Sequence, residues 1–137
     1  MTRKGSAVWK GDLKGGSGTV STDSGVLSNS QYSFKTRFED GIGTNPEELL
    51  AAAHAACFSM ALSNQLTQQG LTADSIETTA SCTMENLTIT KFHLDLVATI
   101  PGADPAKFEA AATAAKEGCP VSRLFKADIT LDSKLIS

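Results

Sequence analysis

The sequence of 137 residues is short of the residue types that build metal centres and disulfide frameworks. It has three cysteines, two histidines and no CxxC pair. An odd number of cysteines cannot form a simple structural disulfide framework, and the histidines, His54 and His93, lie far apart along the chain. Metal binding is therefore the weakest expectation, and buried packing or catalysis remain for the cysteines.

Blocks of like charge and long apolar runs are also missing. The net charge is −3 with both signs interspersed, which argues against nucleic acid or anionic lipid as a partner. No window approaches the roughly 20 apolar residues that span a bilayer, and the basic N-terminus lacks the apolar stretch of a secretion signal. Without a GxGxxG or Walker loop, nucleotide cofactors have no support. Because neither a membrane span nor a secretion signal is evident, we expect a cytoplasmic protein.

The length and the 41% hydrophobic content predict one domain over residues 1–137 with a real core. Alternating side chains between turn residues predict short strands at residues 7–9, 18–22 and 32–39. Helix-start signals predict a helix from Asn45–Pro46 to about Gly70, a helix after Asp104–Pro105 and a short helix from Pro120. Further strands are predicted at 76–84, from there up to about Ile100, and at 127–135. The apolar phase slips between Ile89 and Phe92, which suggests a bulge. The expected class is α+β, in the order βββ-α-ββ-αα-β.

The first long helix is nearly apolar on all sides between Leu49 and Leu62. A helix that is hydrophobic all round must be buried all round, and a small domain rarely has enough layers to do that. We therefore expect a second copy of the chain to cover part of this helix.

Two cysteines lie in unlike local settings. Cys57 is inside the apolar run AAAHAACFSMAL, and Cys119 is in the sequence GCPVS at the start of a helix. The first free N–H groups of that helix would stabilise a thiolate at Cys119, and the two residues suit a reactive thiol with a partner that closes a disulfide on it. The competing interpretations are a small packed hydrophobe for Cys57 and a plain turn residue for Cys119.

Candidates for activating Cys57 also have simpler interpretations. Arg37 could favour its thiolate, or could be a solvated charge on a strand. Glu47 lies ten residues earlier, about 15 Å along a continuous helix, so it could join Cys57 only from an antiparallel second copy; otherwise it complements the helix dipole. His54 could be a base, although packing is favoured, and Cys82 has no expected role.

The segments NPEELLAAAHAACFSMAL, GCPVS, WKGDLKGGSGTVSTDSGVLS and YSFKTRFE together resemble the superfamily of osmotically inducible (OsmC) and organic hydroperoxide resistance (Ohr) proteins, and the TRFE context is closer to the OsmC branch. The resemblance covers essentially the whole chain. It implies an intertwined homodimer in which central helices are wrapped by two sheets built from both chains. It also implies a stress-defence peroxidase with peroxidatic Cys57, resolving Cys119, and Arg37 and Glu47 completing the site.

The resemblance further implies a redox-active Cys57–Cys119 disulfide, no metal, haem or flavin, and an external dithiol of the lipoyl type as reductant. The apolar surroundings of Cys57 favour organic hydroperoxides over hydrogen peroxide as substrates. Two alternatives stay open at this point. One is a cysteine hydrolase that uses His54 as base, and the other is a non-catalytic thiol sensor or a dimer that binds an apolar ligand.

Overall fold

The structure is a computed structural model that describes residues 1–137. The chain forms two compact units, Met1–Leu49 and Leu50–Ser137. The expectation of a single domain over residues 1–137 stays a prediction. No helix is both long enough and apolar enough to cross a membrane.

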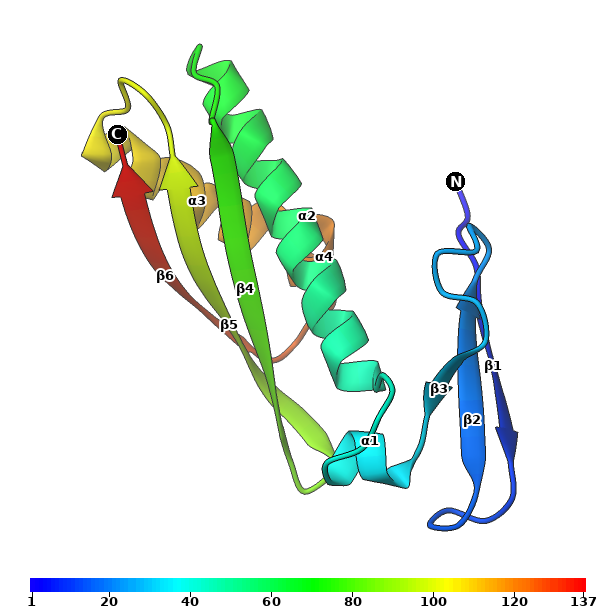
Figure 1. Cartoon of the computed structure of the whole chain (residues 1–137). Helices are drawn as coiled ribbons and strands as arrows, with labels where there is room; N and C mark the ends of the chain where they lie inside the picture. The colour runs from blue at the N-terminus through cyan, green and yellow to red at the C-terminus, as the bar shows by residue number, and fades with distance from the viewer. The chain divides into compact units, whose positions relative to one another are not determined.

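The first unit contains an antiparallel sheet of three strands in the order β1-β2-β3. The strands are β1 (Gly5–Lys10), β2 (Ser17–Thr22) and β3 (Ser30–Tyr32) (Figure 1). The Trp9 and Tyr32 rings, whose centroids are 5.5 Å apart, meet at a tilt and cover Gly18 of the central strand. A Cβ at that glycine would lie only 2.5 Å from the Tyr32 ring, so the aromatic pair requires glycine there.

The expected strand over residues 32–39 is wrong beyond its first residue. After β3 the chain forms the short helix α1 (Phe34–Phe38). Ser33 and Thr36 cap it reciprocally: the Ser33 hydroxyl accepts the Thr36 N–H, and Thr36 Oγ1 accepts the Ser33 N–H. This capping box satisfies two donors that an alternating pattern of side chains does not reveal. Arg37 therefore lies on a helix and not on a strand.

The long helix α2 (Pro46–Gln68) confirms the predicted helix, and Asn45 accepts the Glu48 N–H through its side chain at 2.8 Å. The second unit then adds a mixed sheet in the order β4-β5-β6, with β5 antiparallel to β4 and parallel to β6. Its elements are β4 (Ser75–Glu85), β5 (Thr88–Thr99), α3 (Pro105–Gly118), α4 (Pro120–Leu124) and β6 (Asp128–Ile136).

The bulge expected between Ile89 and Phe92 is present, and a turn between β4 and β5 precedes it. Asn86 and Leu87 have positive φ values of 51° and 61°, which suits a tight turn between antiparallel strands. Thr83 pairs with Lys91 and Met84 pairs with Ile89, so Thr90 is the extra residue on β5.

The core of the second unit lies where α2 and α3 pack on one face of the mixed sheet (Figure 1). Its fully buried members include Phe58 and Leu62 from α2, Leu94 from β5 and Phe108 from α3. The opposite side of α2 is uncovered in the single chain, and the Met60 side chain is 77% exposed. The α+β class is confirmed, and the observed order differs from the expected one only by α1. The intertwined dimer stays a prediction.

Candidate active site

Cys57 and Cys119 open onto one pocket of about 460 Å³ in the second unit. Cys57 is half-buried on α2, and Cys119 is 1% exposed at the junction of α3 and α4. Met60 and Ala61 from α2 and Ala114 from α3 give the pocket apolar walls, and Asn64 adds a polar group. The fold thus brings together two cysteines that are distant in sequence.

The environment of Cys57 in this unit favours its neutral thiol. Burial raises the pKa of the Cys57 thiol, and the neighbouring Cys119, through a hydrogen bond and its charge, raises that pKa further. The Val121 N–H, which donates to Cys57 Sγ at 3.5 Å, lowers the pKa but does not outweigh burial. Only a thiolate attacks a peroxide, so a reactive Cys57 requires a further group that stabilises its negative charge.

Cys119 ends α3 and begins α4, as the sequence GCPVS predicts. Its Sγ accepts the Ser122 N–H at 3.4 Å as the N-cap of α4. The same sulfur donates its S–H to Ser122 Oγ at 3.1 Å. The sulfur therefore has a donor that stabilises its charged form and an acceptor for its proton.

Arg37 and Glu47 form an ion pair within the first unit. Arg37 Nε donates to Glu47 Oε1 at 2.9 Å, and Arg37 Nη2 lies 2.8 Å from the same oxygen. The other carboxylate oxygen of Glu47, Oε2, is buried and has no partner. The Arg37 side chain is 39% exposed against 12% for Glu47, and its guanidinium lies 5.4 Å from the centre of the Phe38 ring. The pair fixes the direction of the guanidinium.

The four predicted site residues thus form two pairs. The cysteine pair belongs to the second unit and the ion pair to the first. The assembly of both pairs into one active site stays a prediction.

Sequence reasoning missed a hydrogen bond between His54 and Ser122. The His54 side chain is fully buried, and its ring meets the rings of Phe92 and Phe125 edge to face at 5.3 and 5.2 Å. His54 Nε2 lies 2.7 Å from Ser122 Oγ. Burial lowers the pKa of His54, so the imidazole is held neutral. The packing role favoured from the sequence is present, but the polar contact was not expected.

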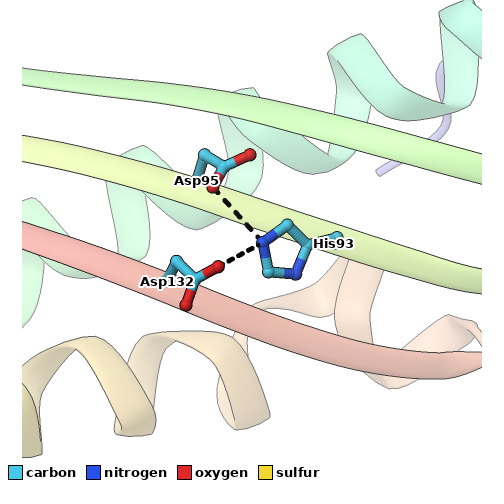
Figure 2. A group of neighbouring side chains, drawn as sticks. All are labelled: His93, Asp95 and Asp132. Atoms are coloured by element: carbon cyan, nitrogen blue, oxygen red, sulfur yellow. Dashed lines mark hydrogen bonds and ion pairs between the residues drawn. The ribbon is translucent and has the colours of Figure 1, made fainter.

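The other histidine, His93, lies on the face of the β4-β5-β6 sheet opposite to His54. There His93 and Asp95 from β5 meet Asp132 from β6 (Figure 2). His93 Nε2 is 2.8 Å from Asp132 Oδ2 and 3.3 Å from Asp95 Oδ1, and its Nδ1 contacts Thr130 Oγ1. One imidazole and two carboxylates are donors that suit a divalent cation. Both carboxylates are exposed, however, and such groups are common on proteins without an ion.

Comparison with known proteins identifies the family. Residues 39–134 match the family described as OsmC-like protein. The chain is also 52% identical to Peroxiredoxin OsmC of Escherichia coli K12, over 98% of this chain and 97% of that protein. The chain belongs to the OsmC-like family. The resemblance stated from its sequence segments is confirmed.

Other relatives place this OsmC-like chain near the organic hydroperoxide resistance proteins. It is 32% identical to OhrB of Bacillus subtilis over 88% of this chain and 90% of that protein. The crystal structure of OhrB matches with a TM-score of 0.66 and covers 98% of both chains at 28% identity. An OsmC-like protein from Vibrio cholerae reaches a TM-score of 0.77 over 97% of this chain and 99% of its own, and at 16% identity it shows the fold alone. The OsmC-like chain is a cysteine-based peroxidase, as expected.

Proposed function

We propose that this protein reduces organic hydroperoxides to alcohols, with Cys57 as the peroxidatic cysteine and Cys119 as the resolving cysteine. The observation that carries the proposal is the shared pocket, in which Cys119 lies close enough to Cys57 to raise its pKa. The relatives support the chemistry, because one is named a peroxiredoxin and another an organic hydroperoxide resistance protein.

The proposed cycle has three balanced steps. The Cys57 thiolate attacks the distal oxygen of ROOH, the O–O bond breaks, and the alkoxide takes a proton to leave as ROH. Cys119 then attacks the Cys57 sulfenic acid, which forms the disulfide and releases water. An external dithiol, proposed to be of the lipoyl type, reduces the disulfide and is itself oxidised to a disulfide. The proposed cycle uses no metal or other cofactor.

Arg37 is proposed as the group that stabilises the Cys57 thiolate, with Glu47 holding the guanidinium in place. A guanidinium beside the thiolate would offset the burial that raises the pKa of Cys57, and would polarise the O–O bond of the substrate. Replacing Arg37 with methionine should slow oxidation of Cys57 about 100-fold, the low end for loss of an electrostatic contact to a reacting group. The matched control is Lys35→Met, which removes an exposed cation from the same short helix.

A homodimer is proposed to bring the two pairs together. The uncovered side of α2 supports it, because it carries small and apolar side chains that a second copy could bury: Ala52, Ala53, Ala56 and Met60. Sedimentation at micromolar concentration should give twice the chain mass. Met60→Lys should weaken this association, and a monomeric wild type that retains full activity contradicts a shared site.

An apolar substrate is proposed because Met60, Ala61 and Ala114 line the pocket. Steady-state turnover with dihydrolipoamide should be faster with cumene hydroperoxide than with hydrogen peroxide. Cys57→Ser should abolish peroxide consumption, Cys119→Ser should allow oxidation without normal recycling, and Cys82→Ser is the cysteine control. Oxidation of wild-type Cys57 without repeated turnover would indicate a sensor instead.

The hydrolase alternative has little geometric support, because His54 Nε2 is hydrogen-bonded to Ser122.

Cytoplasmic residence stays a prediction, and cell fractionation tests it.

A further inference from the structure

The His54–Ser122 contact continues to the sulfur of Cys119. Cys119 donates its S–H to Ser122 Oγ at 3.1 Å, and Ser122 Oγ lies 2.7 Å from His54 Nε2. Because the serine oxygen accepts the thiol proton, its own hydrogen is available to the imidazole nitrogen. The three groups form a continuous path for a proton from the sulfur to the ring.

This path is almost entirely buried. Ser122 is 5% exposed, Cys119 is 1% exposed and His54 is fully buried. Hydrogen bonds inside such an environment are electrostatically stronger than in water. The imidazole packs against two apolar rings, Phe92 from β5 and Phe125 after α4. The titratable group that reaches it through Ser122 is the Cys119 thiol.

The imidazole has one polar attachment. Its Nδ1 is buried without a hydrogen-bond partner, whereas most buried polar atoms in proteins have one. The single contact directs the chemistry of the ring towards Ser122 and the sulfur beyond it.

We propose that Ser122 is a catalytic residue that accepts the proton of Cys119 when this thiol attacks the Cys57 sulfenic acid, and that His54 acts through Ser122 by taking the serine proton. The inference rests on the proposed function, because it requires Cys119 to be the resolving cysteine. As the Cys119 sulfur bonds to the Cys57 sulfur, the S–O bond of the sulfenic acid breaks and hydroxide leaves. The thiol proton passes to Ser122 Oγ while the serine proton passes to His54 Nε2.

The imidazolium then returns its proton to Ser122 Oγ, and the serine gives a proton to the departing hydroxide to form water. The net reaction is thiol plus sulfenic acid to disulfide plus water, with Cys119 oxidised and the Cys57 sulfur reduced. The lowered pKa of His54 suits a group that holds the proton only briefly. The Ser122 N–H, which donates to Cys119 Sγ, stabilises the thiolate while the proton is away.

The test separates the two oxidation steps in a single turnover. Reduced protein is mixed with one equivalent of cumene hydroperoxide and quenched at intervals, and mass spectrometry counts sulfenic acid trapped with dimedone and the Cys57–Cys119 disulfide. Ser122→Ala removes the hydroxyl but keeps the N–H that caps α4. Ser59→Ala is the matched control, because that serine bonds Thr78 on β4 and not the cysteines.

Ser122→Ala should slow disulfide formation about 100-fold or more, as loss of a proton-transfer group predicts, while the rate of Cys57 oxidation changes less than about twofold. His54→Gln should give a similar defect, because its amide can bond Ser122 but cannot take a proton, and the double variant should be no slower. Ser122→Thr, which restores a hydroxyl, should recover part of the rate. Sulfenic and sulfinic acid should accumulate in the two slow variants.

If both Ser122→Ala and His54→Gln form the disulfide at the wild-type rate, the proton relay through Ser122 to His54 is overturned and the proposed function is left intact. Equal slowing of both oxidation steps also overturns the relay, because it indicates a general structural defect. If the wild type forms no Cys57–Cys119 disulfide, the proposed function and the relay fail together.

Discussion

The two histidines occupy opposite faces of the β4-β5-β6 sheet, and their surroundings differ in every respect that matters for chemistry. His54 packs against Phe92, fully buried and bonded to a single hydroxyl. His93, the next residue along β5 from Phe92, is partly exposed and contacts two carboxylates and a threonine. Successive residues of β5 point to opposite faces of the sheet, so Phe92 packs on the buried His54 and His93 contacts the solvent-exposed carboxylates.

The number of polar contacts around each histidine does not measure their effect on stability. The outer cluster has more contacts, but water and salt screen charges there, and exposed ion pairs contribute about 0–1 kcal/mol. The inner path has fewer contacts, yet each lost partner leaves a buried polar atom unsatisfied. We expect substitutions on the inner face to have the larger effects.

The largest effect should come from Phe92→Ala, which removes the ring that touches His54 and stacks on Phe125 at 4.1 Å between centroids. A cavity of this kind should lower the free energy of unfolding by about 3–5 kcal/mol. Urea denaturation measures it, with the exposed Lys91→Ala beside it as control. A loss below 1 kcal/mol for Phe92→Ala would show that this face is not packed as described.

The pH dependence of stability should separate the two histidines next. Because burial lowers the pKa of His54 in the folded state, the unfolded chain binds the proton more readily, and stability falls as pH drops below about 6.5. The stability difference between wild type and His54→Gln should change by up to about 1.4 kcal/mol per pH unit between pH 7 and 5. A His93→Gln background should preserve this change, since the residues are on opposite faces.

A smaller effect is expected from Ser59→Ala on the inner face. The Ser59 and Thr78 hydroxyls lie 2.7 Å apart between α2 and β4. Loss of this bond should lower the free energy of unfolding by about 0.5–1.5 kcal/mol, with Thr79→Ala on the exposed side of β4 as control. Thermal denaturation of the two variants side by side measures the difference, and equal melting temperatures contradict the prediction.

The smallest effect should come from the outer cluster. Asp132→Asn removes one of the charges beside His93, and the free energy of unfolding should change by less than about 1 kcal/mol. The change should be smaller still in 1 M salt, where the Debye length is only about 3 Å and charges farther apart are screened. A loss that exceeds that of Ser59→Ala, or one that salt leaves untouched, would reverse the ranking of the two faces.

Much of the candidate site was predictable because its signals are local. The residues Asn45 and Pro46 mark the start of α2, and the sequence GCPVS marks Cys119 as the cap between two helices. The helix α1 escaped prediction because its Ser33–Thr36 capping box lies inside a segment that also alternates like a strand. Arg37 stays a candidate site residue, and it lies on a helix rather than on the expected strand.

Local patterns along the chain are enough to predict the α+β class, the main helix boundaries, the bulge in β5 and the two cysteines as candidates, since each depends on neighbouring residues. Only the tertiary structure decided that Cys57 and Cys119 share a pocket and that His54 bonds Ser122, 68 positions away. Such contacts are set by how α2 and α4 pack on the sheet. Periodicity along a chain carries no information about which distant side chains that packing will bring together.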